Sequence, residues 1–187
     1  MNDRFDIVET ALTGLYQIQR KPRGDDRGWL ERMYCSTDLA EVLGSRAIVQ
    51  VNRSLTRAKG TVRGMHYQIS PSGEAKLVSC LRGEIFDVAV DLRRHSSTFL
   101  QWHGEMLSAE NRRSLFVPEG FAHGFQAIED DCEVLYLSTA AYDPSAERGV
   151  HPLDPQVAIA WPREIENLSE RDAAHAALAP GFDGVVA

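Results

Sequence analysis

The sequence predicts a mainly β fold, either a sandwich or a closed barrel. Apolar residues recur at every second position through most of the middle of the chain, which is the period of a strand. Turn residues separate these stretches at regular intervals, at 70–74, 82–84, 118–120 and 129–131. Many short strands divided in this way are typical of all-β sandwiches and barrels.

The alternating stretches are the expected strands, and helices are expected only towards the two ends. The strands are predicted at 47–52, 61–68, 75–93, 114–120, 123–129 and 132–139. The stretch STDLAEVLG, at 36–44, has Ser and Thr as N-cap candidates and ends in Gly44. The stretch LSERDAAHAAL, at 168–178, begins with Ser169 followed by acidic residues, as a helix start does.

Length and composition indicate one globular domain spanning 1–187. A chain of 187 residues that is 43% hydrophobic fills one core and is short for two. Its net charge of −7 argues against binding to nucleic acid or to an anionic membrane. Three cysteines without a C-x-x-C spacing favour a reducing cytoplasm over a disulfide framework. No apolar stretch approaches the roughly 20 residues that span a bilayer, and the N-terminus lacks a signal peptide pattern.

Polar side chains share strand faces with apolar ones. Alternation puts Gln50 with Asn52, Lys76 with Val78 and Cys80, and Tyr136 with Val134. An interior that is partly apolar and partly polar indicates a lined pocket instead of a fully packed core.

Arg63 and His66, in GTVRGMHYQ, lie on opposite faces of an ideal strand. Gly64 stands between them, and a glycine inside a strand often marks a β-bulge. A bulge at Gly64 would turn both side chains towards the interior.

A metal site is one interpretation of the histidines. The stretch PEGFAH, at 118–123, resembles the second half of a cupin metal motif, with His123 as a ligand and His66 as a second. The first half of that motif needs a His-x-His pair and a Glu, and MHYQ provides one histidine. Two separated imidazoles are too few ligands for a tightly held divalent ion, so we expect no metal and no other cofactor.

Acid–base chemistry is the preferred interpretation. A histidine works as a base near neutral pH when a carboxylate orients its ring, and Asp172 is a candidate for that carboxylate. A tyrosine can return a proton to carbon, and a lysine can stabilise a developing oxyanion. Base, acid and cation together describe enolisation beside a ketone and reprotonation, which on a chiral carbon is epimerisation.

The chain resembles the dTDP-4-dehydrorhamnose 3,5-epimerase family, which consists of cupin-fold enzymes of deoxysugar nucleotide synthesis. The resemblance runs from about residue 13 to 175 and includes the blocks GDDRGWLER, VQVNRS, GTVRGMHYQ, AKLVSCLRGEIFDVAVDLR, SSTF, LSAENRRSLFVPEGFAHGF, LYLSTAAYDPSAERG and LSERD. It implies a cupin-type jelly-roll and a cofactor-independent epimerase of a nucleotide-diphospho-4-keto-6-deoxy sugar. It also implies a homodimer whose N-terminal strands reach into the partner.

The resemblance assigns roles by matching position. His66 is the implied base, Asp172 its dyad partner, Tyr136 the acid on the opposite face and Lys76 the stabiliser of the enolate. The implied substrate-binding residues are His123 at the sugar; Arg63, as a buried guanidinium, and Arg27 at the diphosphate; Gln50, Val51 and Asn52 at the nucleotide; Tyr142 stacked on the base; and Glu147 and Arg171 at the rim. In a dimer, Arg27 would serve the neighbouring subunit's site.

The departures from the family pattern leave the acid–base residues intact. Arg32 stands where the family has a Glu, with Glu31 one residue out of register, so the contact of either with the nucleotide stays open. Leu137 and Arg171 stand where lysines are usual. We therefore keep three alternatives: a single-centre 3- or 5-epimerase on another nucleotide 4-keto sugar, an isomerase that moves the keto group, and a non-catalytic nucleotide-sugar-binding cupin. Tyr142, Gln50 and Asn52 favour thymidine as the base.

Overall fold

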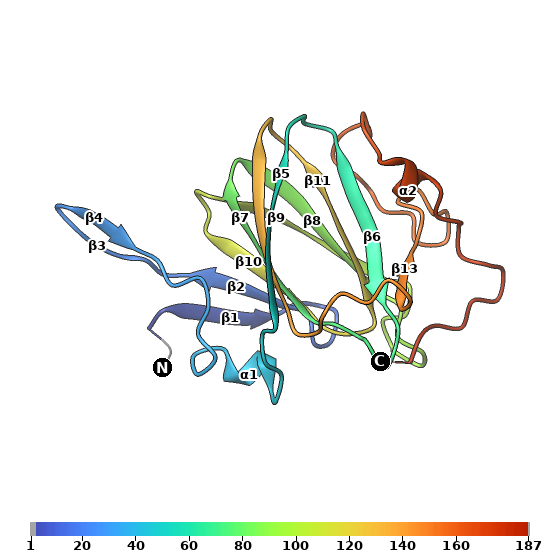
Figure 1. Cartoon of the computed structure of the whole chain (residues 1–187), viewed down its shortest axis with the longest axis horizontal. Coiled ribbons are helices and arrows are strands. Elements are labelled where there is room, and N and C mark those ends of the chain that lie inside the picture. The colour runs from blue at the N-terminus through green and yellow to red at the C-terminus, as the bar shows by residue number, and fades with distance from the viewer. Residues whose placement is uncertain (1–2, 187) are drawn as a thin grey trace.

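The computed structural model describes residues 3–186 as two facing antiparallel sheets with a projecting hairpin (Figure 1). The first sheet has the strand order β1-β2-β10-β7-β12-β5. Its strands are β1 (Phe5–Glu9), β2 (Tyr16–Arg20), β10 (Arg113–Val117), β7 (Lys76–Arg82), β12 (Cys132–Ser138) and β5 (Gln50–Thr56). The predicted mainly β fold is confirmed, and of the two predicted forms it is the sandwich.

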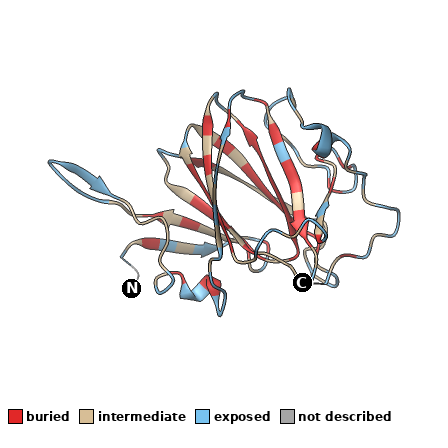
Figure 2. Cartoon of the chain, viewed as in Figure 1, coloured by how far each residue is buried: buried red, intermediate tan, exposed pale blue. Residues whose placement is uncertain are grey.

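The second sheet faces the first and has the order β13-β6-β11-β8-β9. Its strands are β13 (Glu147–Gly149), β6 (Val62–Gln68), β11 (Phe121–Ala127), β8 (Glu84–Asp91) and β9 (Trp102–Ser108). Sequence alternation located β5 to β8 and β10 to β12 but missed β1, β2, β9 and β13. It also missed the hairpin strands β3 (Arg23–Asp25) and β4 (Gly28–Leu30), whose residues are all exposed and carry no alternation (Figure 2).

Both predicted helices exist but are short. Helix α1 (Ala40–Leu43) starts at Leu39, and among the described residues no side chain caps it, so the predicted Ser or Thr cap is wrong. Its predicted end is confirmed, because Gly44 follows at φ 59°, in the region that favours glycine. Helix α2 (Glu170–Ala173) starts at Ser169 as predicted. The Ser169 hydroxyl accepts a hydrogen bond from the Asp172 amide. No helix in residues 3–186 has the length and apolar character needed to cross a membrane.

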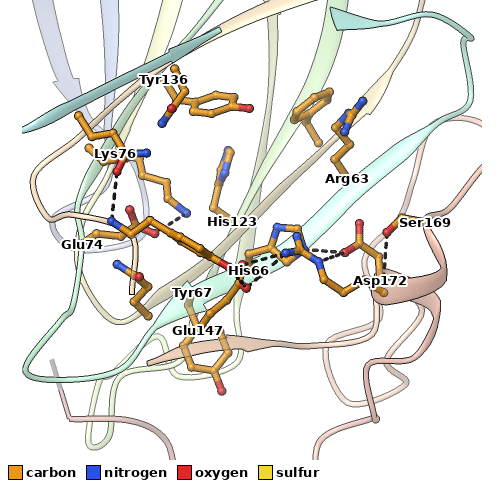
Figure 3. A pocket seen from close by; sticks show the side chains of 17 residues that line it. Arg63, His66, Tyr67, Glu74, Lys76, His123, Tyr136, Glu147, Ser169 and Asp172 are labelled. Carbon is orange, nitrogen blue, oxygen red and sulfur yellow. Dashed lines mark hydrogen bonds and ion pairs between the residues drawn. The ribbon is translucent and has the colours of Figure 1, made fainter. Parts of the chain in front are cut away.

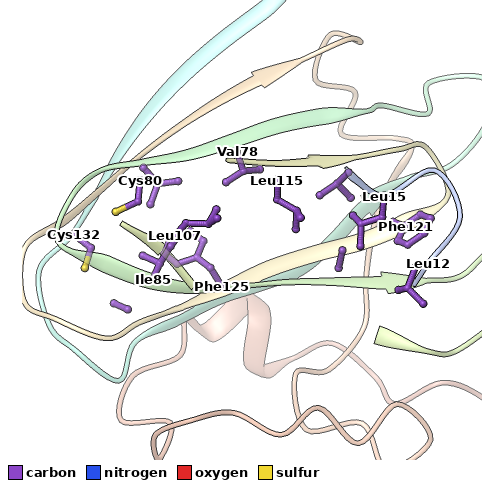
Figure 4. Close-up of a cluster of buried hydrophobic side chains, with 14 residues drawn as sticks. Leu12, Leu15, Val78, Cys80, Ile85, Leu107, Leu115, Phe121, Phe125 and Cys132 are labelled. Atoms are coloured by element: carbon purple, nitrogen blue, oxygen red, sulfur yellow. The ribbon is translucent and has the colours of Figure 1, made fainter. Parts of the chain in front are cut away.

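The main core lies between the two sheets (Figure 4). Its members alternate along the inner faces of the strands; they include Val78 and Cys80 on β7, Val134 on β12, Ile85 on β8 and Phe125 on β11. The same faces continue into polar residues, since Lys76 precedes Val78 by two positions and Tyr136 follows Val134 by two. The core therefore lies beside a polar cavity that the same strand faces help to form.

The outer faces of both sheets are partly covered. Helix α1 supplies Val42 and Leu43 to a cluster on the first sheet that includes Leu77 and Phe116. The C-terminal segment supplies Val150 and Val157 to a cluster on the second sheet. This coverage brings α2 beside β6, so that a residue near the C-terminus reaches a strand about 100 residues earlier.

The predicted bulge at Gly64 is confirmed. On β11, His123 pairs with His66 and Phe125 pairs with Arg63, so β6 carries one extra residue between these pairs. Gly64 adopts φ 122°, and a Cβ there would lie 2.6 Å from Gly124 Cα. A side chain at this position is excluded by both conformation and space.

Replacing Gly64 tests this constraint on the fold. We expect Gly64→Ala to lower the free energy of unfolding by about 2 kcal/mol or more, because strained backbone costs roughly 1–3 kcal/mol and β6 must also move away from β11. Gly73→Ala is the control, since its new Cβ would make ordinary contacts at 3.6 Å. Urea unfolding measures both, and equal midpoints for the two variants would contradict the close approach.

Candidate active site

A cavity of about 440 Å³ opens between the two sheets beside the core (Figure 3). Both sheets, the loop after β12 and helix α2 contribute to its wall. It is lined by Gln50, Asn52, Arg63, His66, Tyr67, Gln68, Glu74, Lys76, His123, Phe125, Tyr136, Ser138, Tyr142, Glu147, Ser169, Arg171 and Asp172. The lining residues come from positions as far apart as 50 and 172, and most of them are polar or charged.

His66 and Asp172 form a hydrogen-bonded pair on one wall. His66 Nε2 lies 2.6 Å from Asp172 Oδ1, and the Gly64 amide donates to Asp172 Oδ2 at 3.2 Å. The Asp172 amide donates in turn to Ser169 Oγ, which holds the carboxylate at the start of α2. With Nε2 donating to the carboxylate, the second ring nitrogen of His66, Nδ1, carries the lone pair.

The carboxyl of Asp172 is held in its ionised form. Its side chain is 4% exposed, and burial by itself raises its pKa. The hydrogen bond and charge interaction with His66, followed by the Gly64 amide and Ser169, outweigh burial and hold the pKa of Asp172 at about 2. An ionised carboxylate at this place stabilises an imidazolium on His66.

Tyr136 and Lys76 lie on the opposite wall, on strands β12 and β7 of the first sheet. Lys76 Nζ pairs with Glu74 Oε1 at 3.0 Å, and both side chains are about 15% exposed. In Figure 3, Tyr136 and His66 approach the cavity from different sides. The cavity therefore presents an imidazole on one face and a phenol and an ammonium on the other.

A second histidine–aspartate pair lies deeper in the cavity. His123 Nε2 is 2.8 Å from Asp87 Oδ1, and the Asp87 side chain is fully buried on β8. The pair fixes the orientation of the His123 ring, which stands next to His66 across the β6–β11 ladder.

The cavity mouth is held by a chain of polar contacts. The Tyr142 hydroxyl donates to Glu147 Oε2 at 2.8 Å, and the Tyr142 amide donates to Gln50 Oε1 at 3.1 Å. Arg171 NH1 pairs with Glu147 at 3.2 Å, while its NH2 lies 3.0 Å from His66 Nε2. These contacts link the mouth to the His66–Asp172 pair.

Comparison with known proteins identifies the family. A family model described as dTDP-4-dehydrorhamnose 3,5-epimerase matches residues 9–180. The chain belongs to this epimerase family. The predicted family, enzyme class and cupin-type β fold are thereby confirmed.

Individual relatives agree with the family assignment. The chain is 46% identical over 164 residues to the dTDP-4-dehydrorhamnose 3,5-epimerase of Pseudomonas aeruginosa, covering 87% of this chain and 90% of that one. It is 43% identical over 163 residues to the dTDP-4-dehydrorhamnose 3-epimerase of Streptomyces niveus, covering 87% and 78%. The structure of dTDP-6-deoxy-D-glucose-3,5-epimerase from Legionella pneumophila, in complex with dTDP-4-keto-L-rhamnose, matches with a TM-score of 0.90 at 41% identity over 98% of each chain.

Within this epimerase fold, the cavity gathers most of the site residues expected from sequence. His66, Tyr136, Asp172 and Lys76 all line it, as do Gln50, Asn52, Arg63, His123, Tyr142, Glu147 and Arg171. Arg63 is exposed, so the expectation of a buried guanidinium is wrong; it donates to Thr56 Oγ1 at 2.9 Å at the cavity edge.

Two expected residues lie outside the cavity. Val51 is 61% exposed, because alternation along the edge strand β5 turns it away from Gln50 and Asn52. Arg27 lies at the turn of the β3–β4 hairpin, paired with Asp25, and its side chain is 88% exposed. The β3–β4 hairpin that carries Arg27 projects from the body of the chain (Figure 1).

Glu31 and Arg32 also lie outside the cavity lining. Glu31 pairs with the buried Arg20 at 3.2 Å, and Arg32 pairs with Asp38 at 2.6 Å. Within this chain both side chains hold local structure beside the hairpin.

Residues that sequence reasoning missed include two that line the cavity and two that lie beside it. Glu74 and Gln68 line the cavity, Asp87 orients His123, and His175 stands behind Asp172 at 3.8 Å. Asp87 carried a usable signal, since an aspartate between apolar residues of a buried strand needs a partner. Glu74 lies in a turn and Gln68 ends a strand, where polar residues are ordinary.

The dyad carboxylate predicts a specific pH dependence of stability. The folded-state pKa of Asp172, about 2, lies below the unfolded value of about 3.9, so its ionisation stabilises the fold above pH 4 by about 2 kcal/mol. This stability is lost as the pH falls from about 4 through 2. We expect Asp172→Asn to flatten the plot of unfolding free energy against pH in that window, measured by urea unfolding. Parallel curves for the two proteins would show that Asp172 does not titrate as described.

Proposed function

We propose that this protein epimerises a nucleotide-diphospho-4-keto-6-deoxy sugar without a cofactor, by removing a proton beside the ketone and returning one to the opposite face. The observation that carries the proposal is the placement of the His66–Asp172 pair and Tyr136 on facing walls of one cavity. A planar enolate between them has a base on one face and an acid on the other.

His66 is the proposed base. Its Nε2 donates to Asp172, so Nδ1 accepts the carbon-bound proton and the ring becomes an imidazolium. Asp172 holds the ring in this tautomer and offsets the positive charge that forms. The low pKa of Asp172 supports this role, because the carboxylate stays ionised throughout the reaction.

Tyr136 is the proposed acid and Lys76 the proposed oxyanion stabiliser. Removing the proton moves electron density onto the ketone oxygen, where an ammonium lowers the energy of the enolate. The Tyr136 phenol then donates its proton to carbon from the far side, which inverts the centre. Glu74 holds Lys76 Nζ in place at 3.0 Å.

The substrate-binding roles follow from position. His123, oriented by the buried Asp87, contacts the sugar beside the base. Gln50, Asn52 and Tyr142 at the mouth bind the nucleotide, and Arg63 binds the diphosphate at the cavity edge. A thymidine diphosphate sugar is the proposed substrate, supported by the dTDP-4-keto-L-rhamnose complex of the Legionella relative.

A single-centre enzyme is the second candidate. The Streptomyces niveus relative, 43% identical, is a 3-epimerase, whereas the Pseudomonas aeruginosa relative is a 3,5-epimerase. Both C3 and C5 flank the C4 ketone, so one base reaches both when the sugar shifts in the cavity. Epimerisation at both centres is the primary proposal.

Deuterium exchange tests the mechanism. dTDP-4-keto-6-deoxyglucose incubated with the enzyme in heavy water is expected to gain deuterium at C3 and C5, because an imidazolium proton exchanges with solvent. His66→Asn is expected to abolish exchange and inversion, whereas Tyr136→Phe retains exchange and loses most inversion, a fall of about 10²-fold or more. NMR of the recovered sugar separates the two readouts.

The control is His95→Asn, which changes an exposed histidine whose positive φ asparagine tolerates. It should behave as wild type. Label at one centre would make the protein a single-centre epimerase. Undiminished exchange in a folded His66→Asn variant would eliminate His66 as the base, and the absence of exchange in wild type would leave a sugar-nucleotide-binding protein.

We further propose that two chains form a homodimer in which the β3–β4 hairpin reaches the partner's cavity and supplies Arg27. The hairpin projects from the body of the chain (Figure 1), and Trp29 and Leu30 on it are 64% and 62% exposed. Apolar residues this exposed on a projecting arm indicate a surface that is covered by another molecule. The cytoplasmic location stays a prediction.

Subunit complementation tests this arrangement. Arg27→Ala and His66→Asn chains are each expected to be inactive alone, while a mixture subjected to subunit exchange regains activity. In hybrid dimers one site combines an intact His66 with an intact partner-derived Arg27, so about half of the hybrid's sites work. Mixing His66→Asn with Asp172→Asn chains is the control and should give no recovery, because both residues belong to the same chain's cavity. A monomer in sedimentation, or no recovery in the first mixture, would contradict the proposal.

A further inference from the structure

His175 has no part in the proposed chemistry, yet it lies against the dyad. Its Nε2 is 3.8 Å from Asp172 Oδ1, and His175 is not among the residues that line the cavity. Its ring meets the His66 ring edge to face, with centroids 5.7 Å apart. Two imidazoles therefore flank one carboxylate oxygen.

The His175 ring occupies a fitted niche. A Cβ added at Gly149 would lie 2.2 Å from His175 Nε2, so the ring packs directly against the backbone of β13. The Nε2 atom is buried and has no hydrogen-bond partner among residues 3–186. A buried polar nitrogen without a partner is costly, which makes this atom a candidate ligand for something bound.

We propose that His66 Nε2, Asp172 Oδ1 and His175 Nε2 form a three-ligand site for a zinc-class divalent ion. The three atoms lie within 4.8 Å of one another. Two imidazoles, one carboxylate and an open fourth position form a ligand set that zinc accepts. Zinc bonds of about 2.0–2.2 Å in tetrahedral geometry place ligand atoms about 3.3–3.5 Å apart. The observed separations of 2.6 Å and 3.8 Å from Asp172 Oδ1 lie on either side of that value.

The positive charge of Arg171 disfavours binding of a cation at this site. Its NH2 group lies 3.0 Å from His66 Nε2, so its positive charge must move before a cation enters. Its Nε also lies 3.6 Å from Asp172 Oδ1, and its NH1 pairs with Glu147 at 3.2 Å. The side chain is 55% exposed, so there is room for it to move towards solvent. Arg171 therefore sets the affinity of the site, and its removal should strengthen metal binding.

The ion would inhibit the enzyme. Coordination through Nε2 requires the lone pair there, which forces the imidazole proton onto Nδ1 and leaves no nitrogen to accept a proton from carbon. This consequence rests on the proposed function, in which His66 is the base. Metal binding itself does not depend on that function.

Cobalt is the probe, because Co²⁺ takes zinc sites and absorbs visible light when tetrahedral. Full-length protein is stripped with a chelator and titrated with CoCl₂ and, by calorimetry, with ZnCl₂. We expect one ion per chain, a visible tetrahedral spectrum, and binding weakened at least about tenfold in His175→Gln. Arg171→Gln is expected to bind more tightly than wild type. His103→Gln is the matched control, since His103 lies 3.5 Å from Glu105 outside the dyad.

His175→Gln and Arg171→Gln are expected to change the affinity for the ion in opposite directions. Undiminished binding in His175→Gln, weaker binding in Arg171→Gln, or no stoichiometric binding by wild type would each overturn the site. If the His175→Gln variant does not fold, metal binding by wild type and by Arg171→Gln still tests the site.

An activity measurement separates the two proposals. Stripped wild-type enzyme should keep its activity, and added ZnCl₂ should inhibit it, with the half-inhibiting concentration at least about tenfold higher in His175→Gln. A cobalt spectrum together with unaffected turnover would support the metal site and eliminate the inhibitory role, and would count against His66 as the base.

Discussion

The close approach of β6 and β11 at Gly64 is the constraint on which the site depends. The extra residue on β6 brings Arg63 and His66 to the same cavity, although ideal alternation would separate them. The Gly64 amide also donates to Asp172 at 3.2 Å, so the backbone feature that orients the base also holds its partner. Only glycine fits there, because a Cβ would lie 2.6 Å from the facing strand.

The cavity is a continuation of the core along the same strand faces. Val78 and Val134 pack in the core, and Lys76 and Tyr136 line the cavity two positions away. Charged and polar groups in this interior need partners, and the fold provides them: Lys76 has Glu74, His123 has Asp87, and His66 has Asp172. Each pairing also fixes the direction of a side chain, which is the precision that proton transfer to and from carbon requires.

Asp172 connects this geometry to electrostatics. Burial alone raises its pKa, and the contacts with His66, Gly64 and Ser169 reverse that effect. The resulting buried negative charge serves the proposed imidazolium and is also the centre of the proposed ion site with His175. Arg171 lies next to both the proposed base and the proposed ion site, since it contacts His66 and Glu147.

The sequence by itself determined strands β5 to β8 and β10 to β12, the bulge, and the shared faces of Gln50 with Asn52, because alternation and a lone glycine act over a few neighbouring positions. Most of the other cavity residues were expected through the family resemblance. The sequence did not determine the hairpin strands, because three exposed residues in each strand are too few to show a period, or the placement of Arg27 on that hairpin. Asp172 was paired with His66 through family resemblance, and spacing could not have shown it. Only the tertiary structure decided that α2 packs beside β6, that Asp87 faces His123 and that His175 fits against Gly149. These contacts join residues from 26 positions apart, for Gly149 and His175, to 106 positions apart, for His66 and Asp172. Such pairings depend on how the sheets and the C-terminal segment pack, which no local pattern encodes.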